Sequence, residues 1–488
     1  MIRSLQRLTR LSAVYTFGDI VAKGAAFLLL PLYTRHLAPA DYGAIGLAEM
    51  IKQVLVMLFS FGTVGAVLRF YYQLSEEQER RRFFGTLWLF LIITPGLLAL
   101  GLDLLGRPFF AALFSQIPFE EFIRPAIWIA YLNTSFGLIP PNLFRTREQA
   151  GRYIAYNLAT FALTNCLIVW LVVGQGRGAV GYMQAQLIAA ALMAVVSLVI
   201  LLREVSLRPA WRFIGPLLFY SLPLLPHFVG HWALSLSDRA ILERFVSLEQ
   251  LGIYTLAFQF ALVFQLTVQS ASNAIMPMFS RAAKDDRERM LLPRVATYYT
   301  FAVTALGLVV ALGAGSVIVW LTPPAYHAAA ALIPWLALSV LCLGLYYVPM
   351  HALTFTAGHT ASIPVMTLLA AGINVALNLL MVPRYGAVAA AVNSAISYAV
   401  LLLLVYLIAR GVSPITYELG RVARLLGIAA LWYMLTLPLL RFHPLTNLAI
   451  VAGMLVLFPL GLLLVGFFDD RERTYLARLL PRLAALLD

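Results

Sequence analysis

The sequence predicts an all-α polytopic membrane protein with about 14 transmembrane helices. Of its 488 residues, 61% are hydrophobic and only 12% are charged, and the mean hydropathy is +0.86. Apolar runs of about 20 residues recur along the whole chain, each long enough to cross roughly 30 Å of hydrocarbon. Because no water is present there to satisfy backbone polar groups, such runs must be helical.

The apolar runs are taken in chain order as spans. They cover residues 13–34, 44–67, 84–104, 122–143, 153–173, 179–202, 213–235, 251–277, 295–320, 328–354, 363–382, 387–409, 421–440 and 446–468. The first run contains Asp19 and Lys23, which a cleavable signal segment tolerates poorly, so it is expected to be retained. Cys166 and Cys342 lack metal-ligand spacing, and neither a metal nor a cofactor is expected.

The distribution of Lys and Arg supports an even number of spans. Most of the 35 lie in the two terminal tails and in the loops 69–82, 145–152, 203–212, 281–294 and 410–424. The opposite side carries Arg35, Arg107, Arg124, Arg177, Arg239, Arg244, Arg384 and Arg441. By the positive-inside rule, both termini are expected in the cytoplasm. The net charge of +13 is attributed to this rule, and no nucleic acid partner is expected.

The chain repeats itself after about 208 residues. "TRHLAPADYGAIGLA" (34–48) aligns with "ERFVSLEQLGIYTLA" (243–257), and "GAVGY" (178–182) aligns with "GAVAA" (386–390). The repeat predicts two parallel six-helix halves, 1–205 and 206–410, around a central cavity, followed by two additional helices and a cytoplasmic tail in 411–488. Gly43 and Gly252 are expected to restart a helix after an outer-face turn, where glycine permits a tight backbone.

The segment 238–250 connects two spans on the predicted outer side. Asp238, Arg239, Glu243 and Arg244 would form one charged flank of a short interfacial helix. The simplest interpretation is a solvated cap between the two spans.

Charged side chains within spans are costly and usually face a cavity or a partner. Asp19 and Lys23 are four residues apart in the first span, and Glu49 and Lys52 are three apart in the second. Two interpretations stay open. The charges form ion pairs that fix packing, or they line a cavity that receives an anionic head group and a coupling cation or proton.

Two further groups of residues are candidates for substrate contact. His227 and His231 lie four residues apart in the seventh span, where Pro223 and Pro226 should bend the helix. They are either packing residues or part of the cavity lining. Arg69, Arg145 and Arg147 end spans on the cytoplasmic side. They either anchor these ends at the membrane surface or capture substrate at the cavity entrance.

Two motifs resemble a known family. "LLLPLYTRHLAPADYGAIGL" (28–47) and "SDRAILERFVSLEQLGIYTLAFQF" (237–260) are similar to the exits of the first and seventh helices of polysaccharide-exporting flippases. These belong to the multidrug, oligosaccharidyl-lipid and polysaccharide exporter superfamily. The resemblance covers most of residues 10–410. The matching positions, which form the outer-face motif, are Tyr33, Arg35, Tyr42, Gly43, Asp238, Arg239, Gly252 and Tyr254.

The resemblance implies a flippase that moves an O-antigen or exopolysaccharide repeat unit, linked to polyprenyl diphosphate, to the outer leaflet of a bacterial or archaeal cell membrane. Membrane lipids, a polysaccharide polymerase and chain-length machinery would be its partners. The alternatives are a flippase for the lipid-linked peptidoglycan precursor and a multidrug or cation antiporter. An enzyme, such as a glycan polymerase or ligase, is not expected, because no outer loop is large enough and no Walker A or G-x-S-x-G motif occurs.

Overall fold

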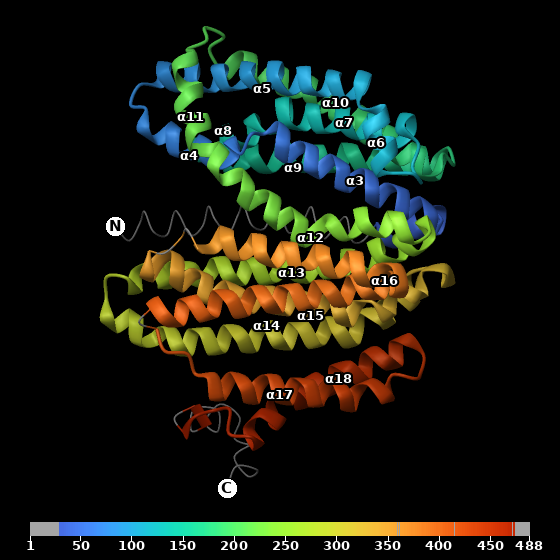
Figure 1. The fold of residues 1–488 in the computed structure, drawn as a ribbon, viewed down its shortest axis with the longest axis vertical. Helices are drawn as coiled ribbons and strands as arrows, with labels where there is room; N and C mark the ends of the chain where they lie inside the picture. Colours follow the sequence, from blue (N-terminus) through green and yellow to red (C-terminus); the bar gives the residue numbers. More distant parts are fainter. Residues whose placement is uncertain (1–28, 359, 361, 414, 471, 474–488) are drawn as a thin grey trace. The chain divides into compact units, whose positions relative to one another are not determined.

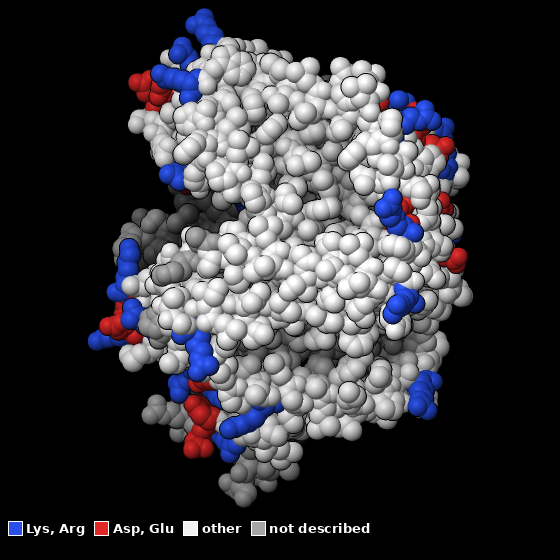
Figure 2. All heavy atoms as spheres, viewed as in Figure 1, with Lys and Arg blue, Asp and Glu red and all other residues white. Residues whose placement is uncertain are grey.

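The structure, a computed structural model, describes residues 29–358, 360, 362–413, 415–470 and 472–473. These residues form helices and contain no strand (Figure 1), which confirms the all-α prediction. Within this described part, ten helices are long and apolar enough to cross a membrane. Charged side chains visible in Figure 2 gather toward the helix ends and leave the helix lengths uncharged. The chain is therefore a multi-pass membrane protein.

Several observed helices differ from the predicted spans. Span 44–67 is divided between α3 (Pro39–Phe59) and α4 (Thr63–Gln73), with positive φ at Phe61 and Gly62 between them. Span 122–143 is divided among the π-helical turn η1 (Phe119–Ile123), α7 (Arg124–Leu132), the π-helical turn η2 (Asn133–Gly137) and α8 (Ile139–Thr146). Span 213–235 is interrupted by the 3-10 turn Leu222–Leu224, at the expected bend near Pro223 and Pro226. Spans 363–382 and 387–409 fall within α16 (Ser362–Val412), which consists of two helices that meet at a kink at Gly386 (φ 58°, ψ −140°), so the predicted break between these two spans is confirmed. Residues 13–28 of the first span lie outside the described residues, so the total of 14 stays a prediction.

The chain divides into two compact units. The first contains the residues up to Leu256 together with Thr322–Ala328 and Pro364–Ser397. The second contains Ala257–Leu321, Ala329–Ile363 and the residues from Tyr398 onward. These bounds differ from those of the predicted repeat halves, which stay a prediction.

The first unit contains most of the N-terminal helices. They are α2 (Leu30–His36), α3 (Pro39–Phe59), α4 (Thr63–Gln73), α5 (Glu77–Leu105), α6 (Arg107–Leu113), η1 (Phe119–Ile123), α7 (Arg124–Leu132), η2 (Asn133–Gly137), α8 (Ile139–Thr146), α9 (Ala150–Ile168), η3 (Val169–Gly174), α10 (Gly178–Glu204), η4 (Trp211–Phe213), α11 (Ile214–Ser221), η5 (Leu222–Leu224) and α12 (Leu225–Phe245). Its apolar core includes Phe83, Phe84, Trp88, Leu143 and Leu217 from α5, α8 and α11.

The second unit contains most of α13 (Leu248–Ala282), α14 (Asp286–Leu321), α15 (Ile333–His351), η7 (Ala352–Ala357), the end of α16 (Ser362–Val412), α17 (Leu419–Thr436), η8 (Leu437–Leu439) and α18 (Pro444–Leu464). The short helix η6 (Pro324–Ala331) is shared between the units. Leu312 of α14, Leu425 of α17 and Phe458 of α18 share one apolar core. The two C-terminal helices therefore pack on α14.

Candidate functional site

Glu49 and Lys52 form an ion pair on α3, with 2.6 Å between Oε2 and Nζ. Gln186 of α10 bonds to both partners. Its Oε1 accepts a hydrogen bond from Lys52 Nζ at 2.8 Å, and its Nε2 donates to Glu49 Oε1 at 2.5 Å. The three side chains form a closed ring in which the two charges cancel, which lowers the cost of placing them within spans.

The Glu49–Lys52–Gln186 ring remains partly accessible, since the side chains of Lys52 and Glu49 are 15% and 26% exposed. The ring fixes α3 against α10, as the packing interpretation expects. It also holds an ammonium group that could exchange the Glu49 carboxylate for a phosphate oxygen, as the cavity interpretation expects. The geometry fits both interpretations.

Of the other four predicted cavity residues, the structure describes the side chain of His231 only. Asp19, Lys23 and the side chain of His227 lie outside the described residues. His231 is exposed on α12. No group of three or more His, Cys, Asp or Glu that could hold a metal ion occurs in the part of the chain that the structure describes.

The three predicted entrance arginines have different surroundings. Arg69 and Arg145 are exposed, and the Arg69 guanidinium carbon lies 4.5 Å from the centroid of the Tyr220 ring. Arg147 instead forms an ion pair with Glu204, which joins the residue that follows α8 to the end of α10. Arg147 therefore has a structural partner, whereas Arg69 and Arg145 are more available to an anionic group.

Asp238 of the outer-face motif accepts three hydrogen bonds in the first unit. Its Oδ2 accepts from the hydroxyls of Tyr254 at 2.6 Å and Ser394 at 2.8 Å, and its Oδ1 accepts from Asn378 Nδ2 at 2.7 Å. Asp238 is 1% exposed and the adjacent Arg239 is 5% exposed. The carboxylate therefore joins α12 to the first turns of α13 and to α16.

Glu243 is buried as well. Its Oε1 accepts hydrogen bonds from the backbone N–H groups of Ser115 at 2.6 Å and Gln116 at 2.7 Å, so the end of α12 holds the loop after α6. The expectation of a solvated cap over 238–250 is therefore wrong for Asp238, Arg239 and Glu243. Arg244 alone of the four charges is exposed.

The two glycines of the outer-face motif allow a close helix contact in the first unit. A Cβ at Gly43 would overlap the carbonyl oxygen of Leu248, and a Cβ at Gly252 would overlap that of Pro39. Neither glycine has a positive φ, so the expected tight-turn role is wrong, and close approach of α3 and α13 is the reason for glycine here.

The remaining motif residues in α2 and α3 differ in exposure. Tyr42 is buried, and its ring meets that of Tyr326 edge-on at 5.5 Å. Tyr33 is also buried, and its hydroxyl donates to Asn165 Oδ1 at 2.8 Å. Arg35 is exposed. The motif therefore consists mainly of packing residues, with one exposed cation.

Sequence reasoning missed a group of polar residues in the second unit. Gln269 Oε1 accepts a hydrogen bond from the Tyr347 hydroxyl at 2.5 Å, and Ser272 Oγ lies 2.8 Å from His351 Nε2. The signal was present, because Gln265, Gln269 and Asn273 recur every four residues within an apolar span. Uncharged amides give a weaker signal than charged residues or histidines, because they also form ordinary hydrogen bonds between membrane helices.

The fold is shared with known membrane transporters. The solved structure of lipid II flippase MurJ in an inward closed conformation matches 94% of this chain and 98% of its own, with a TM-score of 0.72 and 13% identity. An inward-facing multidrug resistance transporter of the MATE family in the MOP superfamily matches 84% of this chain and 94% of its own, with a TM-score of 0.61 and 14% identity. At these identities the likeness shows the fold alone.

Sequence comparison shows the family. The family model described as "Polysaccharide biosynthesis protein" matches residues 8–283, and the chain belongs to this family. A Haemophilus influenzae protein of the Lsg locus is 24% identical over 57% of this chain and 67% of its own length. The succinoglycan biosynthesis transport protein ExoT of Rhizobium meliloti is 22% identical over 58% of this chain and 56% of its own length. The predicted resemblance is confirmed.

Proposed function

We propose that this protein flips a polyprenyl-diphosphate-linked oligosaccharide, an O-antigen or exopolysaccharide repeat unit, from the inner to the outer leaflet by alternating access. The family match over residues 8–283 carries the proposal. The relative named as a succinoglycan biosynthesis transport protein and the transporter fold add support. The protein would be a transporter and not an enzyme, with both termini in the cytoplasm of a bacterial or archaeal cell.

The outer-face glycines support the two related halves that alternating access needs. Pro39 and Leu248 correspond at an offset of 209 residues, as do Gly43 and Gly252. Their contacts are reciprocal: Gly43 lies against the carbonyl oxygen of Leu248, and Gly252 lies against the carbonyl oxygen of Pro39. Reciprocal contacts between corresponding residues are what a two-fold axis produces.

A second pair of glycines agrees with this axis. Gly178 and Gly386, which correspond at an offset of 208, have φ values of 56° and 58°. A Cβ at Gly178 would lie 3.8 Å from Asp41 Oδ1, and one at Gly386 would lie 3.5 Å from Gln250 Oε1. Asp41 and Gln250 themselves correspond at the offset of 209. We propose that residues 1–205 and 206–410 are the two halves that rock about this axis.

Deletion of the gene is expected to trap the substrate in the inner leaflet. Mass spectrometry of extracted lipids should show complete single repeat units on polyprenyl diphosphate, together with loss of surface polysaccharide. The same units would build up in a strain without a polymerase, which we propose as a partner of the flippase. Leaflet accessibility distinguishes the two, because failed polymerisation leaves the units exposed on the outer leaflet.

Two alternatives predict other phenotypes. The fold shared with lipid II flippase MurJ favours a peptidoglycan-precursor flippase, whose loss would be lethal. The fold shared with the MATE transporter favours a multidrug or cation antiporter, whose loss would sensitise cells to toxic cations without glycolipid build-up. A viable deletion strain that accumulates repeat units would contradict both.

Substitutions in the Glu49–Lys52–Gln186 ring are expected to show whether the ring only fixes helix packing or also contacts the substrate. Lys52→Met should lower both protein level and surface polysaccharide, because Glu49 is left without its counter-ion. The double variant Glu49→Gln/Lys52→Gln removes both charges and should restore the protein level. Surface polysaccharide should still be reduced at least tenfold, as measured by immunoblot, if Lys52 contacts the diphosphate. Full recovery of polysaccharide in the double variant would leave Lys52 with a packing role only.

A further inference from the structure

Helix α13 carries a row of uncharged amides within a candidate membrane span. Gln265, Gln269 and Asn273 are spaced four residues apart and therefore lie on one helical face. Gln265 and Gln269 are half-buried, and Asn273 is exposed. We call these three residues the amide face. Amide side chains inside membrane helices either hydrogen-bond across to neighbouring helices or, like ionisable groups, face a water-filled cavity.

Part of the amide face is held in place by its neighbours. Gln269 Nε2 donates to Asn273 Oδ1 at 3.3 Å, and the buried Tyr347 of α15 donates to Gln269 Oε1. Each primary amide has two donor hydrogens and two acceptor lone pairs. These bonds therefore orient the two amides but leave donors and acceptors on both of them for a ligand.

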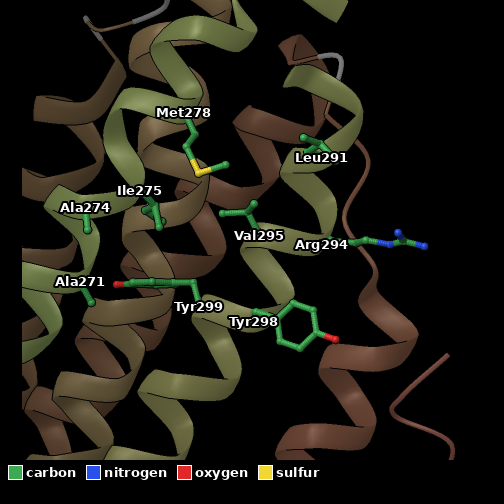
Figure 3. Close-up of a pocket in the computed structure, with 9 residues that line it drawn as sticks. All are labelled: Ala271, Ala274, Ile275, Met278, Leu291, Arg294, Val295, Tyr298 and Tyr299. Carbon is green, nitrogen blue, oxygen red and sulfur yellow. The ribbon is translucent and has the colours of Figure 1, made fainter. Parts of the chain in front are cut away.

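The opposite face of α13 has a different character. Ala271, Ala274, Ile275 and Met278 line an apolar groove of about 510 Å³ against Val295 and Tyr299 of α14, and Figure 3 shows these side chains around the groove. Arg294 points away from the groove in the same view and pairs with Asp469 at 3.0 Å. The groove side thus suits hydrocarbon, whereas an exposed amide in hydrocarbon would cost several kcal/mol.

We propose that the amide face of α13 binds the sugar hydroxyls of the transported glycan inside an aqueous cavity. This inference rests on the proposed function and deepens it. Neutral amides both donate to and accept from hydroxyl groups, but they supply no charge for a diphosphate. The amide face therefore recognises the glycan, and its contribution is separate from that of any cationic group that holds the diphosphate.

The first experiment tests whether the amide face meets water, whatever the protein transports. Cys166 and Cys342 are replaced by serine, and single cysteines are introduced as Gln269→Cys, Asn273→Cys and Ala274→Cys. Permeabilised membrane vesicles are treated with a charged thiol reagent. Cysteines at 269 and 273 should react at least tenfold faster than the one at 274, which lies in the apolar groove. Equal protection of all three would overturn the inference and leave the proposed function standing.

The second experiment tests recognition of the glycan. The thermal unfolding temperature of purified full-length protein is measured with undecaprenyl diphosphate and, separately, with the lipid-linked oligosaccharide extracted from the deletion strain. The oligosaccharide should stabilise the wild type more than undecaprenyl diphosphate does. Gln269→Leu and Asn273→Leu should each weaken oligosaccharide binding about fivefold to tenfold and leave binding of undecaprenyl diphosphate unchanged.

Thr267→Val is the matched control, because Thr267 is exposed on another face of α13 and its hydroxyl bonds to the carbonyl of Val263 at 3.1 Å. Wild-type affinity for both lipids in all three variants would overturn the inference alone. A wild type that neither lipid stabilises would overturn the proposed function and the inference with it.

Discussion

An Asp238→Ala variant is expected to be about 3–5 kcal/mol less stable than the wild type, the usual cost of breaking a buried charge network. The change leaves the hydroxyls of Tyr254 and Ser394 and the amide of Asn378 without their shared acceptor. It also removes the carboxylate next to the buried guanidinium of Arg239. Fluorescence-detected thermal unfolding in detergent, together with the amount of folded protein in membranes, measures the effect.

Two further variants provide reference values for the stability lost in Asp238→Ala. Tyr254→Phe removes one of the three hydrogen bonds and should cost about 1 kcal/mol. Asp286→Ala removes a carboxylate that is 86% exposed and should change stability by less than about 1 kcal/mol. If Asp238→Ala were as stable as Asp286→Ala, the network would contribute nothing to stability, and α12 would be held to α16 by other contacts, such as the bond from Ser237 Oγ to Asn374 Oδ1.

Alanine at Gly43 or Gly252 is expected to force α3 and α13 apart. Each added Cβ would overlap a backbone carbonyl oxygen, and backbone has no other rotamer to adopt, so the cost should reach or exceed the ~1–3 kcal/mol of ordinary overpacking. Because the two contacts are reciprocal, the single variants should lose similar stability. The double variant should lose less than their sum, since one separation of the helices relieves both overlaps.

Gly372→Ala is the matched control for these variants. Gly372 lies in α16 of the same unit, and a Cβ there would meet nothing within 4 Å. The control should therefore be neutral or about 0.5–1 kcal/mol more stable, as for glycine replacement inside a helix. Thermal unfolding of the four variants side by side is the measurement. Unchanged stability of Gly43→Ala and Gly252→Ala would contradict the close contact.

Properties that depend on local composition could be predicted from the sequence. Apolar runs of the right length identified the helical membrane fold, and the bend near Pro223 and Pro226 was placed correctly. The outer-face motif identified the family. These features follow from a short window of residues and need no knowledge of what lies opposite.

Properties that depend on distant partners could not be predicted. Asp238 and Glu243 looked solvated because most of the groups that donate hydrogen bonds to them are more than 100 residues away along the chain; only Tyr254 is near, 16 residues from Asp238. Gly43 and Gly252 were assigned to turns because a sequence does not reveal two helices in contact. Glu49 and Lys52 were paired correctly as one possibility, but Gln186, which bonds to both, is an uncharged residue in another apolar run.

The Asp238 network also has a consequence for the order in which the chain is made and inserted. Asn378 and Ser394 follow Asp238 by 140 and 156 residues. Ribosomes synthesise the chain from its N-terminus, so α12 is made before α16. The Asp238 carboxylate therefore enters the membrane before its hydrogen-bond donors Asn378 and Ser394 exist. Until then, local water, the nearby Tyr254 or the insertion machinery must accommodate this charge. The hydrogen-bond network of the first unit can therefore be completed only after α16 has been synthesised. Chains that end earlier should be substrates for membrane quality control.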